Sequence, residues 1–241
     1  PSHQSLQSHT MNLHIAIRRL PAWMLMLTAL CSCTSDGYDT GDGQLSYLKS
    51  EFVVARTASA TSIHQALTDD NQLLNLSPVL TAAWADEPDT EYRALLNYKA
   101  NAEQSTESSI TVEPISISRV MVLEPKAPAD CSDPHTDALG VESAWVGKNG
   151  KYINLRLALK TGEPQTDDQR QTVGLMLTDE QTDSQGHTTM TLQLLHNQNG
   201  VPQYYTVSTF VSIPTSAFAA GSTVRLNINT YDGVVQKVFN L

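Results

Sequence analysis

The residues with the clearest chemistry are two cysteines near the start of the chain, in the sequence Leu30-Cys31-Ser32-Cys33. An apolar residue, a variable residue, a small residue and a cysteine follow one another in a bacterial lipobox. There the cysteine thiol becomes a thioether to diacylglycerol, and the small residue before it fits the peptidase. Cys31 fits less well, because Leu30 would then stand where a small residue belongs. We therefore predict lipidation of Cys33.

The residues before Cys33 have the composition of a secretory signal peptide. Arg18 and Arg19 form a positive stretch, and Leu20–Leu30 is a mostly apolar run of eleven residues. A signal peptide needs about 7–15 such residues, whereas a membrane span needs roughly 20. The alternative is a buried core helix, but no amphipathic continuation follows Cys33. We interpret residues 1–32 as upstream residues and a signal peptide that is removed.

A polar stretch, residues 33–43, follows and has no apolar periodicity, so we expect a lipidated tether. Its aspartates Asp36, Asp39 and Asp42 resemble the acidic export signal that Bacteroidetes lipoproteins carry just after the cysteine. That resemblance implies an outer-membrane protein that faces the cell exterior; a plain solvated linker is the alternative. Each buried CH₂ of an acyl chain contributes about 0.8 kcal/mol, so two or more chains give stable attachment.

The charge of the chain argues against one class of partner. The full sequence has 15 Lys and Arg against 25 Asp and Glu, a net charge of −10. Cleavage before Cys33 removes Arg18 and Arg19, which leaves 13 basic against 25 acidic residues and a charge of −12. Because phosphate contacts need a basic surface, we expect no nucleic-acid partner. Anionic lipid is repelled as well, so the membrane contact depends on the acyl chains of Cys33.

Alternation of apolar and polar residues predicts an all-β body, since period two places one face of a strand in the core. Val224–Asn229 and Ile153–Leu157 alternate strictly, and helical periodicity is limited to a short segment near Val79–Ala85. We expect strands over Leu48–Thr57, Ser62–Leu67, Leu73–Leu76, Tyr92–Lys99, Ile110–Leu123, Leu139–Val146, Tyr152–Leu159, Gln171–Thr178, Met190–His196, Tyr204–Ile213, Val224–Tyr231 and Val234–Phe239.

Turn residues divide these strands into two groups. Asn149-Gly150, Asn199-Gly200 and Asp232-Gly233 have the residues of two-residue hairpin turns, and Asp183–Gly186 predicts a longer turn. We therefore expect an antiparallel immunoglobulin-like β-sandwich over residues 138–241. Shorter strands over residues 44–125 predict a small OB-like barrel. The proline- and aspartate-rich residues 126–137 are interpreted as the linker between the two.

Several stretches carry a resemblance to a known family. They are Leu95-Leu96-Asn97-Tyr98, Val120-Met121-Val122-Leu123, Trp145, Tyr152-Ile153-Asn154-Leu155, Asn199-Gly200-Val201-Pro202-Gln203-Tyr204-Tyr205 and Leu226-Asn227-Ile228-Asn229-Thr230-Tyr231-Asp232-Gly233. Through them nearly all of the mature chain resembles the NigD-like lipoproteins of Bacteroidetes. The resemblance implies an OB-like N-terminal domain and a C-terminal β-sandwich. The family name carries a bacteriocin association, but the resemblance supplies no activity and no site residue.

No catalytic or metal-binding motif stands out in the mature chain. Its histidines are not spaced four residues apart and do not cluster with cysteine, and His196 is expected as a polar edge residue. Cys131 is interpreted as an inert thiol in an acidic loop. Acidic pairs such as Asp179-Glu180 are interpreted as solvated loops. We therefore predict no enzyme activity, no cofactor and no metal, with a hydrolase that uses an unrecognised carboxylate pair as one alternative.

Aromatic residues are the best candidates for ligand binding. Trp84 lies in an expected loop of the barrel, and Tyr204-Tyr205 follow the Asn199-Gly200 turn. Exposed aromatic rings beside polar groups stack on sugars or grip peptides. Because neighbouring strand residues face opposite ways, one of the two tyrosines is expected to be buried. Trp145 and Tyr152 are expected in the core.

These observations favour a non-enzymatic binding or accessory module at the cell surface, with a glycan, a peptide or a protein as its partner. A structural or assembly lipoprotein of an envelope complex is the other alternative. Such a protein is expected to expose an apolar patch and to lack a pocket.

Overall fold

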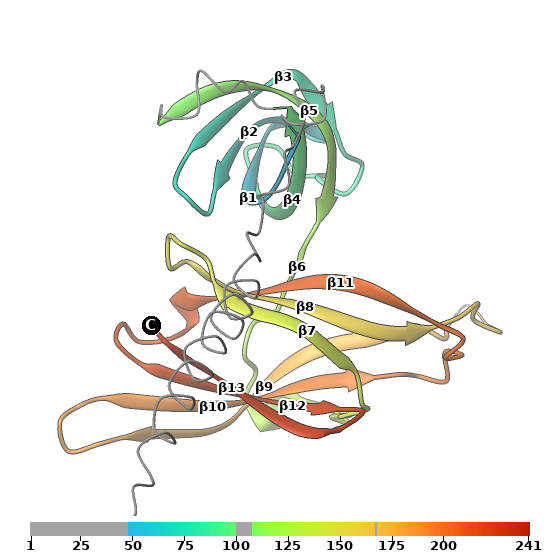
Figure 1. The fold of residues 1–241 in the computed structure, drawn as a ribbon, viewed down its shortest axis with the longest axis vertical. Helices are drawn as coiled ribbons and strands as arrows, with labels where there is room; N and C mark the ends of the chain where they lie inside the picture. The colour runs from blue at the N-terminus through green and yellow to red at the C-terminus, as the bar shows by residue number, and fades with distance from the viewer. Residues whose placement is uncertain (1–47, 100–107, 167) are drawn as a thin grey trace, which may run out of the picture. The chain divides into compact units, whose positions relative to one another are not determined.

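The computed structural model describes residues 48–99, 108–166 and 168–241, and these belong to one compact unit. Every regular element in these ranges is a β-strand or a short 3-10 turn (Figure 1). The all-β fold class expected from the alternation is therefore confirmed. The predicted lipidation site Cys33, the signal peptide and the tether lie outside the described residues.

Five strands close into a barrel, in the order β1-β2-β3-β5-β4. They are β1 (Leu48–Ser59), β2 (Ser62–Thr68), β3 (Leu73–Thr81), β4 (Glu91–Lys99) and β5 (Ser109–Arg119). β3 and β5 run parallel, and the other neighbours are antiparallel. Alternate residues such as Val53 and Ala55 of β1 point inward, where Leu74, Leu96 and Tyr98 fill the core. This is the expected small OB-like barrel.

Two four-stranded sheets form a sandwich, with the orders β6-β11-β8-β7 and β13-β12-β10-β9 (Figure 1). The elements are β6 (Met121–Val122), η3 (Pro128–Asp130), β7 (Gly140–Val146), β8 (Tyr152–Thr161), β9 (Thr172–Thr182), β10 (Thr188–Asn197), β11 (Tyr205–Pro214), η4 (Thr215–Ala217), β12 (Thr223–Thr230) and β13 (Gly233–Asn240). Two pairings, β6 with β11 and β10 with β12, are parallel, and the other pairings between these strands are antiparallel. Ile153, Leu155 and Leu157 of β8 are among the fully buried side chains between the sheets.

The strand expected over Ile110–Leu123 is interrupted at Val120. β5 ends one residue earlier in the barrel, and β6 starts one residue later in the sandwich. The backbone N–H of Val120 donates to the carbonyl of Arg93 at 2.9 Å. The apolar alternation continues through these residues, so it does not mark the passage from barrel to sandwich. That passage depends on pairing partners that lie far away in the sequence.

Hairpins form at two of the three predicted places, but neither dipeptide is itself a two-residue turn. Asn149-Gly150 lies within the five residues 147–151 that join β7 to β8, and Tyr231-Asp232 join β12 to β13, with Gly233 as the first residue of β13. The longer turn at Asp183–Gly186 joins β9 to β10, also as expected. Asn199-Gly200 is not a hairpin turn, because β10 and β11 belong to different sheets. Both residues still take positive φ, 46° and 69°. Local turn chemistry is the same whether the next strand pairs with the previous one or crosses to the other sheet.

The short helix expected near Val79–Ala85 does not form. β3 continues through Thr81, and Leu80 pairs with Ile63 of β2. Pairing with a neighbouring strand satisfies the backbone of these residues, which outweighs a weak helical pattern.

Residues 126–137 follow the surface of the sandwich. Lys126 pairs with Met176 of β9, and Thr136 pairs with His196 of β10. Between them lies the short turn η3. This segment therefore contributes backbone hydrogen bonds to two strands of one sheet.

Candidate functional site

Trp84 lies in the loop between β3 and β4, as expected, and is half-buried. Its ring meets Tyr92 edge to face, with centroids 5.7 Å apart, and packs against the barrel core. The Tyr92 hydroxyl accepts a hydrogen bond from the N–H of Glu87 at 2.9 Å. Trp84 thus has one side on the barrel core and one side open to solvent.

Tyr204 and Tyr205 are both exposed, with 78% and 57% of their surfaces open. The expectation that one of the two rings is buried is wrong. Tyr204 precedes β11, and its ring lies against Gly162. A Cβ at residue 162 would be only 2.8 Å from that ring, so a glycine is needed there for the ring to take this position. Tyr205 opposes Thr161 on the core-facing side of β11 but stands at the first residue of the strand. Alternation buries a side chain only where the second sheet covers it.

A hydrogen-bonded turn fixes the segment that carries these tyrosines. The Gln198 amide donates to the carbonyls of Lys160 at 3.0 Å and Val201 at 2.9 Å. Its backbone N–H donates to Oδ2 of Asp137 at 2.7 Å, and the N–H of Tyr204 donates to Thr161 at 2.9 Å. The tyrosine pair is therefore held by the end of β8 before any ligand arrives.

His196 contributes to the same region and corrects another expectation. It is buried, not a polar edge residue. Nδ1 lies 3.1 Å from the carbonyl of Asp137, and Nε2 lies 3.1 Å from Oε1 of Gln171. The reason is its position on the core-facing side of β10, in alternation with the buried Met190, Leu192 and Leu194.

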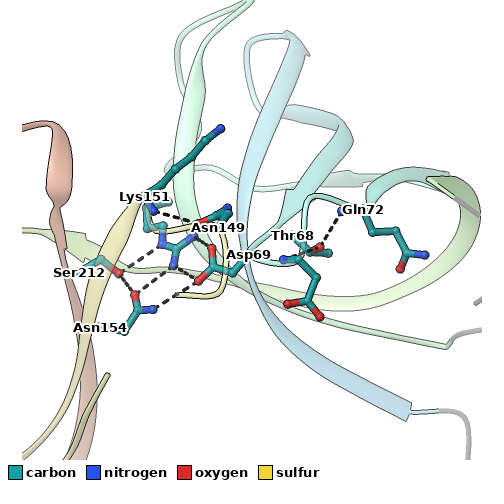
Figure 2. Close-up of polar contacts among 9 residues, drawn as sticks. Thr68, Asp69, Gln72, Asn149, Lys151, Asn154 and Ser212 are labelled. Atoms are coloured by element: carbon teal, nitrogen blue, oxygen red, sulfur yellow. Dashed lines mark hydrogen bonds and ion pairs between the residues drawn. The ribbon is translucent and has the colours of Figure 1, made fainter. Parts of the chain in front are cut away.

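A buried arginine, which the sequence analysis does not identify, lies where the barrel meets the sandwich. Arg93 of β4 is only 4% exposed. Its Nη1 and Nη2 donate to the two carboxylate oxygens of Asp69, each at 2.7 Å. Nη2 also donates to Oδ1 of Asn154 at 3.0 Å, and Nε donates to Oγ of Ser212 at 3.2 Å. Figure 2 shows Asp69, Asn154 and Ser212 converging from different strands and turns.

The acceptors around Arg93 also bind one another. The Ser212 hydroxyl donates to Oδ1 of Asn154 at 2.7 Å, and the Asn154 amide donates to Asp69 at 3.3 Å. The guanidinium lies 4.1 Å from the ring centroid of Tyr152. A buried charge with a bidentate partner and further hydrogen bonds is compensated, so this cluster is suited to joining two structural parts.

The turn between β2 and β3 presents Asp69 to this cluster. Oγ1 of Thr68 accepts hydrogen bonds from the N–H groups of Asp70 at 3.2 Å and Gln72 at 3.1 Å (Figure 2). The carbonyl of Asp69 accepts from the N–H of Asn149 at 2.8 Å. At the exposed rim Lys148 contacts Asp70 at 2.7 Å, and this hydrogen bond raises the pKa of Lys148. The turn is thus tied to the turn between β7 and β8.

Aromatic rings form the apolar part of the same contact. Phe52 of the barrel meets Trp145 and Phe210 of the sandwich edge to face, at centroid distances of 5.6 and 5.2 Å. Trp145 and Tyr152, expected in the core, are half-buried at this contact. One sequence signal for it is Arg93 itself, a lone charge inside the apolar run of β4. Asn154 gives no such signal, because its place in an alternating strand predicts an exposed side chain.

The family of the chain follows from its second half. A family model, the NigD-like C-terminal beta sandwich domain, matches residues 120–240, which hold the strands β6 to β13. The chain belongs to the NigD-like family. The resemblance drawn from the sequence is thereby confirmed, and no curated protein matches the chain.

Solved structures support the fold over 78–80% of this NigD-like chain. A NigD-like immunity protein from Bacteroides caccae is 23% identical, with a TM-score of 0.60, and the match covers 78% of this chain and 91% of that one. A toxin-related protein from Parabacteroides distasonis is 18% identical, with a TM-score of 0.60 and coverages of 80% and 93%. A protein from Bacteroides fragilis that is named as a candidate lipoprotein is 13% identical, with a TM-score of 0.51 and coverages of 80% and 96%. At these identities the likeness concerns the fold.

One hollow of the NigD-like sandwich is lined by a cysteine, an aspartate and a histidine. A cavity of about 470 Å³ lies between residues 121–135 and the strands β9 and β10. Cys131, a free and half-buried thiol, lines it together with Asp133 and His135. Nε2 of His135 lies 2.9 Å from Oδ2 of Asp133. Within residues 48–99, 108–166 and 168–241 there is no group of three side chains able to hold a metal ion.

In the part of the chain that the structure describes, no helix has the length and apolar character to cross a membrane.

Proposed function

We propose that this NigD-like chain is a lipid-anchored envelope protein that acts as a non-enzymatic binding module. In this proposal, acyl chains on Cys33 hold it in the outer membrane, and the folded part faces the cell exterior. Its partner is a glycan, a peptide or a protein. The observation that carries the proposal is the exposed, prearranged pair Tyr204 and Tyr205.

Two features make this pair suited to binding. Large aromatic rings gain the most from leaving water, yet 78% of Tyr204 and 57% of Tyr205 are exposed. In addition, Gln198 and Thr161 hold the backbone beside them by hydrogen bonds. A partner that binds prearranged rings loses less conformational entropy than one that must order a loop.

Tyr204→Ala/Tyr205→Ala is expected to weaken ligand binding at least tenfold, because anchor side chains carry most of the binding energy. The two single variants show how this loss divides between the rings. The measurement is a titration of the full chain with ligands selected from an array of bacterial surface glycans and a library of linear peptides. Val234→Ala, on the exposed strand β13, is the control and is expected to bind as the wild type does. Binding that survives Tyr204→Ala/Tyr205→Ala unchanged would contradict the site.

The lipid anchor is tested separately. Cys33→Ala is expected to move the protein from the membrane fraction to the aqueous fraction and to abolish incorporation of a labelled fatty acid, because the thioether cannot form. Cys31→Ala is the matched control and is expected to leave both readouts unchanged. The lipoprotein named among the similar structures, from Bacteroides fragilis, supports this expectation. A Cys33→Ala protein that stays with the membrane without acylation contradicts the anchor.

Protease accessibility on intact cells tests the orientation. Digestion of the folded part by protease added outside the cells is expected. Full protection in intact cells, together with digestion after the outer membrane is opened, would contradict the outward-facing position.

A protein partner has support from one comparison. The similar structure from Bacteroides caccae is described as a NigD-like immunity protein, and an immunity role extended to this chain would make its partner a protein.

A further inference from the structure

In the described part of the chain, one edge of the sandwich is open along Tyr205–Phe210 of β11. In the sheet β6-β11-β8-β7, β11 pairs with β8 along its whole length but with β6 only at Val211 and Ser212. Among the described residues, no backbone partner lies on the β6 side of Tyr205–Phe210. The Ser212 carbonyl accepts from the N–H of Leu123 at 2.9 Å on that side. Since successive peptide groups alternate, Thr206, Ser208 and Phe210 direct their N–H and C=O groups toward the open edge.

The residues of this open edge favour pairing with another strand. Tyr205-Thr206-Val207-Ser208-Thr209-Phe210 contains no charged residue, no proline and no glycine, and most of its residues have high β propensity. Val207 opposes Leu159 on the core-facing side of the sheet. It is nevertheless 40% exposed. An added strand would therefore cover apolar surface as well as pair backbone groups.

The other three edges of the sandwich carry devices that discourage pairing. On β13, Lys237 opposes the buried Leu226, which places a charged side chain on the core-facing side of an edge strand. On β7 there is Glu142, at an irregularity between Val141 and Ser143. On β9, Asp179 and Glu180, which were expected in a loop, lie in the strand and are exposed. The edge of β11 has no such protection.

We propose that Tyr205–Phe210 accepts an extended, uncharged segment of a partner protein as an additional strand beside β11. The inference rests on the proposed function and gives it a partner class and a binding mode. Backbone hydrogen bonds from Thr206, Ser208 and Phe210 supply affinity, as in other cases of strand addition. Tyr204 and Tyr205 grip the segment where it passes the end of the strand.

The charges beside the edge specify the segment. On the outer face Arg156 forms an ion pair with Glu142, so the two charges compensate each other next to Ser208. On the core-facing side Val207 offers an apolar surface. An uncharged segment with β-branched or aromatic residues at every second position matches both faces.

A second copy of this chain matches the edge less well. In antiparallel pairing centred on Ser208, Tyr205 of one copy would oppose Val211 of the other. Val211 is already paired with Met121, so contact ends at Phe210. A second copy can therefore pair only along Thr206–Phe210, which leaves Tyr204 and Tyr205 outside the paired stretch. A self-associating edge would show as a mass that rises with protein concentration, which light scattering of the full chain measures.

The test selects, from a displayed library of linear peptides of about ten residues, those that bind the full chain. Enriched peptides are expected to be uncharged and to bind Ser208→Pro and Val207→Lys at least tenfold more weakly than wild type. Proline removes the N–H that points to the open edge, and lysine introduces the charge that protects β13. Val234→Lys is the matched control on β13 and is expected to bind normally.

Hydrogen exchange supplies a readout that does not depend on a variant. Bound peptide is expected to slow exchange of the amides of Thr206, Ser208 and Phe210. Thermal melts of Ser208→Pro and Val207→Lys check that each folds. If Ser208→Pro unfolds, peptides methylated on alternate backbone nitrogens replace it, and they are expected to lose binding to the wild type.

The outcomes separate this inference from the proposed function. Peptides whose binding falls with Tyr204→Ala but survives Ser208→Pro and Val207→Lys would contradict the added strand and keep the binding module. Glycan binding without enrichment of any peptide would do the same. A dimer that forms through this edge would overturn the choice of partner. If every tyrosine variant still binds all ligands as the wild type does, both the added strand and the proposed function are contradicted.

Discussion

Arg93→Ala is expected to lower the free energy of unfolding by about 3–5 kcal/mol, the range for breaking a buried ion pair by removing one partner. Arg93 is almost fully buried, and its removal leaves the Asp69 carboxylate without its bidentate donor. Asn154 and Ser212 also lose hydrogen bonds. The measurement is denaturant unfolding followed by tryptophan fluorescence and circular dichroism.

The same experiment tests whether Arg93 couples the barrel to the sandwich. Wild type is expected to unfold in one transition, and Arg93→Ala is expected to show two, because the contact that joins the two parts is weakened. Arg156→Ala is the matched control: its partner Glu142 is exposed on the sandwich, so a loss below about 1 kcal/mol is expected. A loss for Arg93→Ala no larger than that of Arg156→Ala contradicts the role given to the buried pair.

Phe52→Ala is expected to cost about 2–3 kcal/mol. Replacing a fully buried phenylalanine by alanine costs about 3–5 kcal/mol. Because Phe52 is only half-buried, a smaller loss is expected. It loses edge-to-face contacts with Trp145 and Phe210 and its contact with the Arg93 guanidinium, 5.2 Å from the ring centroid. The stability of the single variant is measured by the same denaturant unfolding.

A double-mutant cycle identifies the coupling. Because Phe52 touches Arg93, the costs of Phe52→Ala and Arg93→Ala are expected to be less than additive. Phe239 lies in the sandwich core, so Phe239→Ala combined with Arg93→Ala is expected to be additive. Full additivity in the first cycle contradicts a shared junction.

The strands of this protein are largely predictable from its residues. Apolar and polar residues alternate over Val224–Asn229. This stretch lies within β12, where Leu226 and Ile228 are buried. Gly150 and Gly233 take the positive φ that their turns require. Such features depend on neighbours along the chain, so a local pattern is sufficient to find them.

The candidate sites were less predictable, for a physical reason that differs from residue to residue. Tyr204 and Tyr205 were found by residue type, but their exposure depends on where the second sheet ends. His196 faces the core in alternation with Leu192 and Leu194, and the polar partners of its ring nitrogens, Asp137 and Gln171, come from distant parts of the chain. Asn154 looks like an exposed strand residue and is fully buried under the barrel contact.

From the sequence alone came the predicted lipidation of Cys33, the acidic charge, the all-β class, most strand positions and the NigD-like resemblance. These follow from composition, residue order and periods of two, which need no knowledge of distant contacts. Only the tertiary structure decided that Arg93 pairs with Asp69 and that the chain passes from β10 to β11 in the other sheet. It also decided that, among the described residues, Tyr205–Phe210 of β11 has a strand neighbour on one side only. Each of these depends on which strands become neighbours, and many pairings satisfy the same alternation equally well.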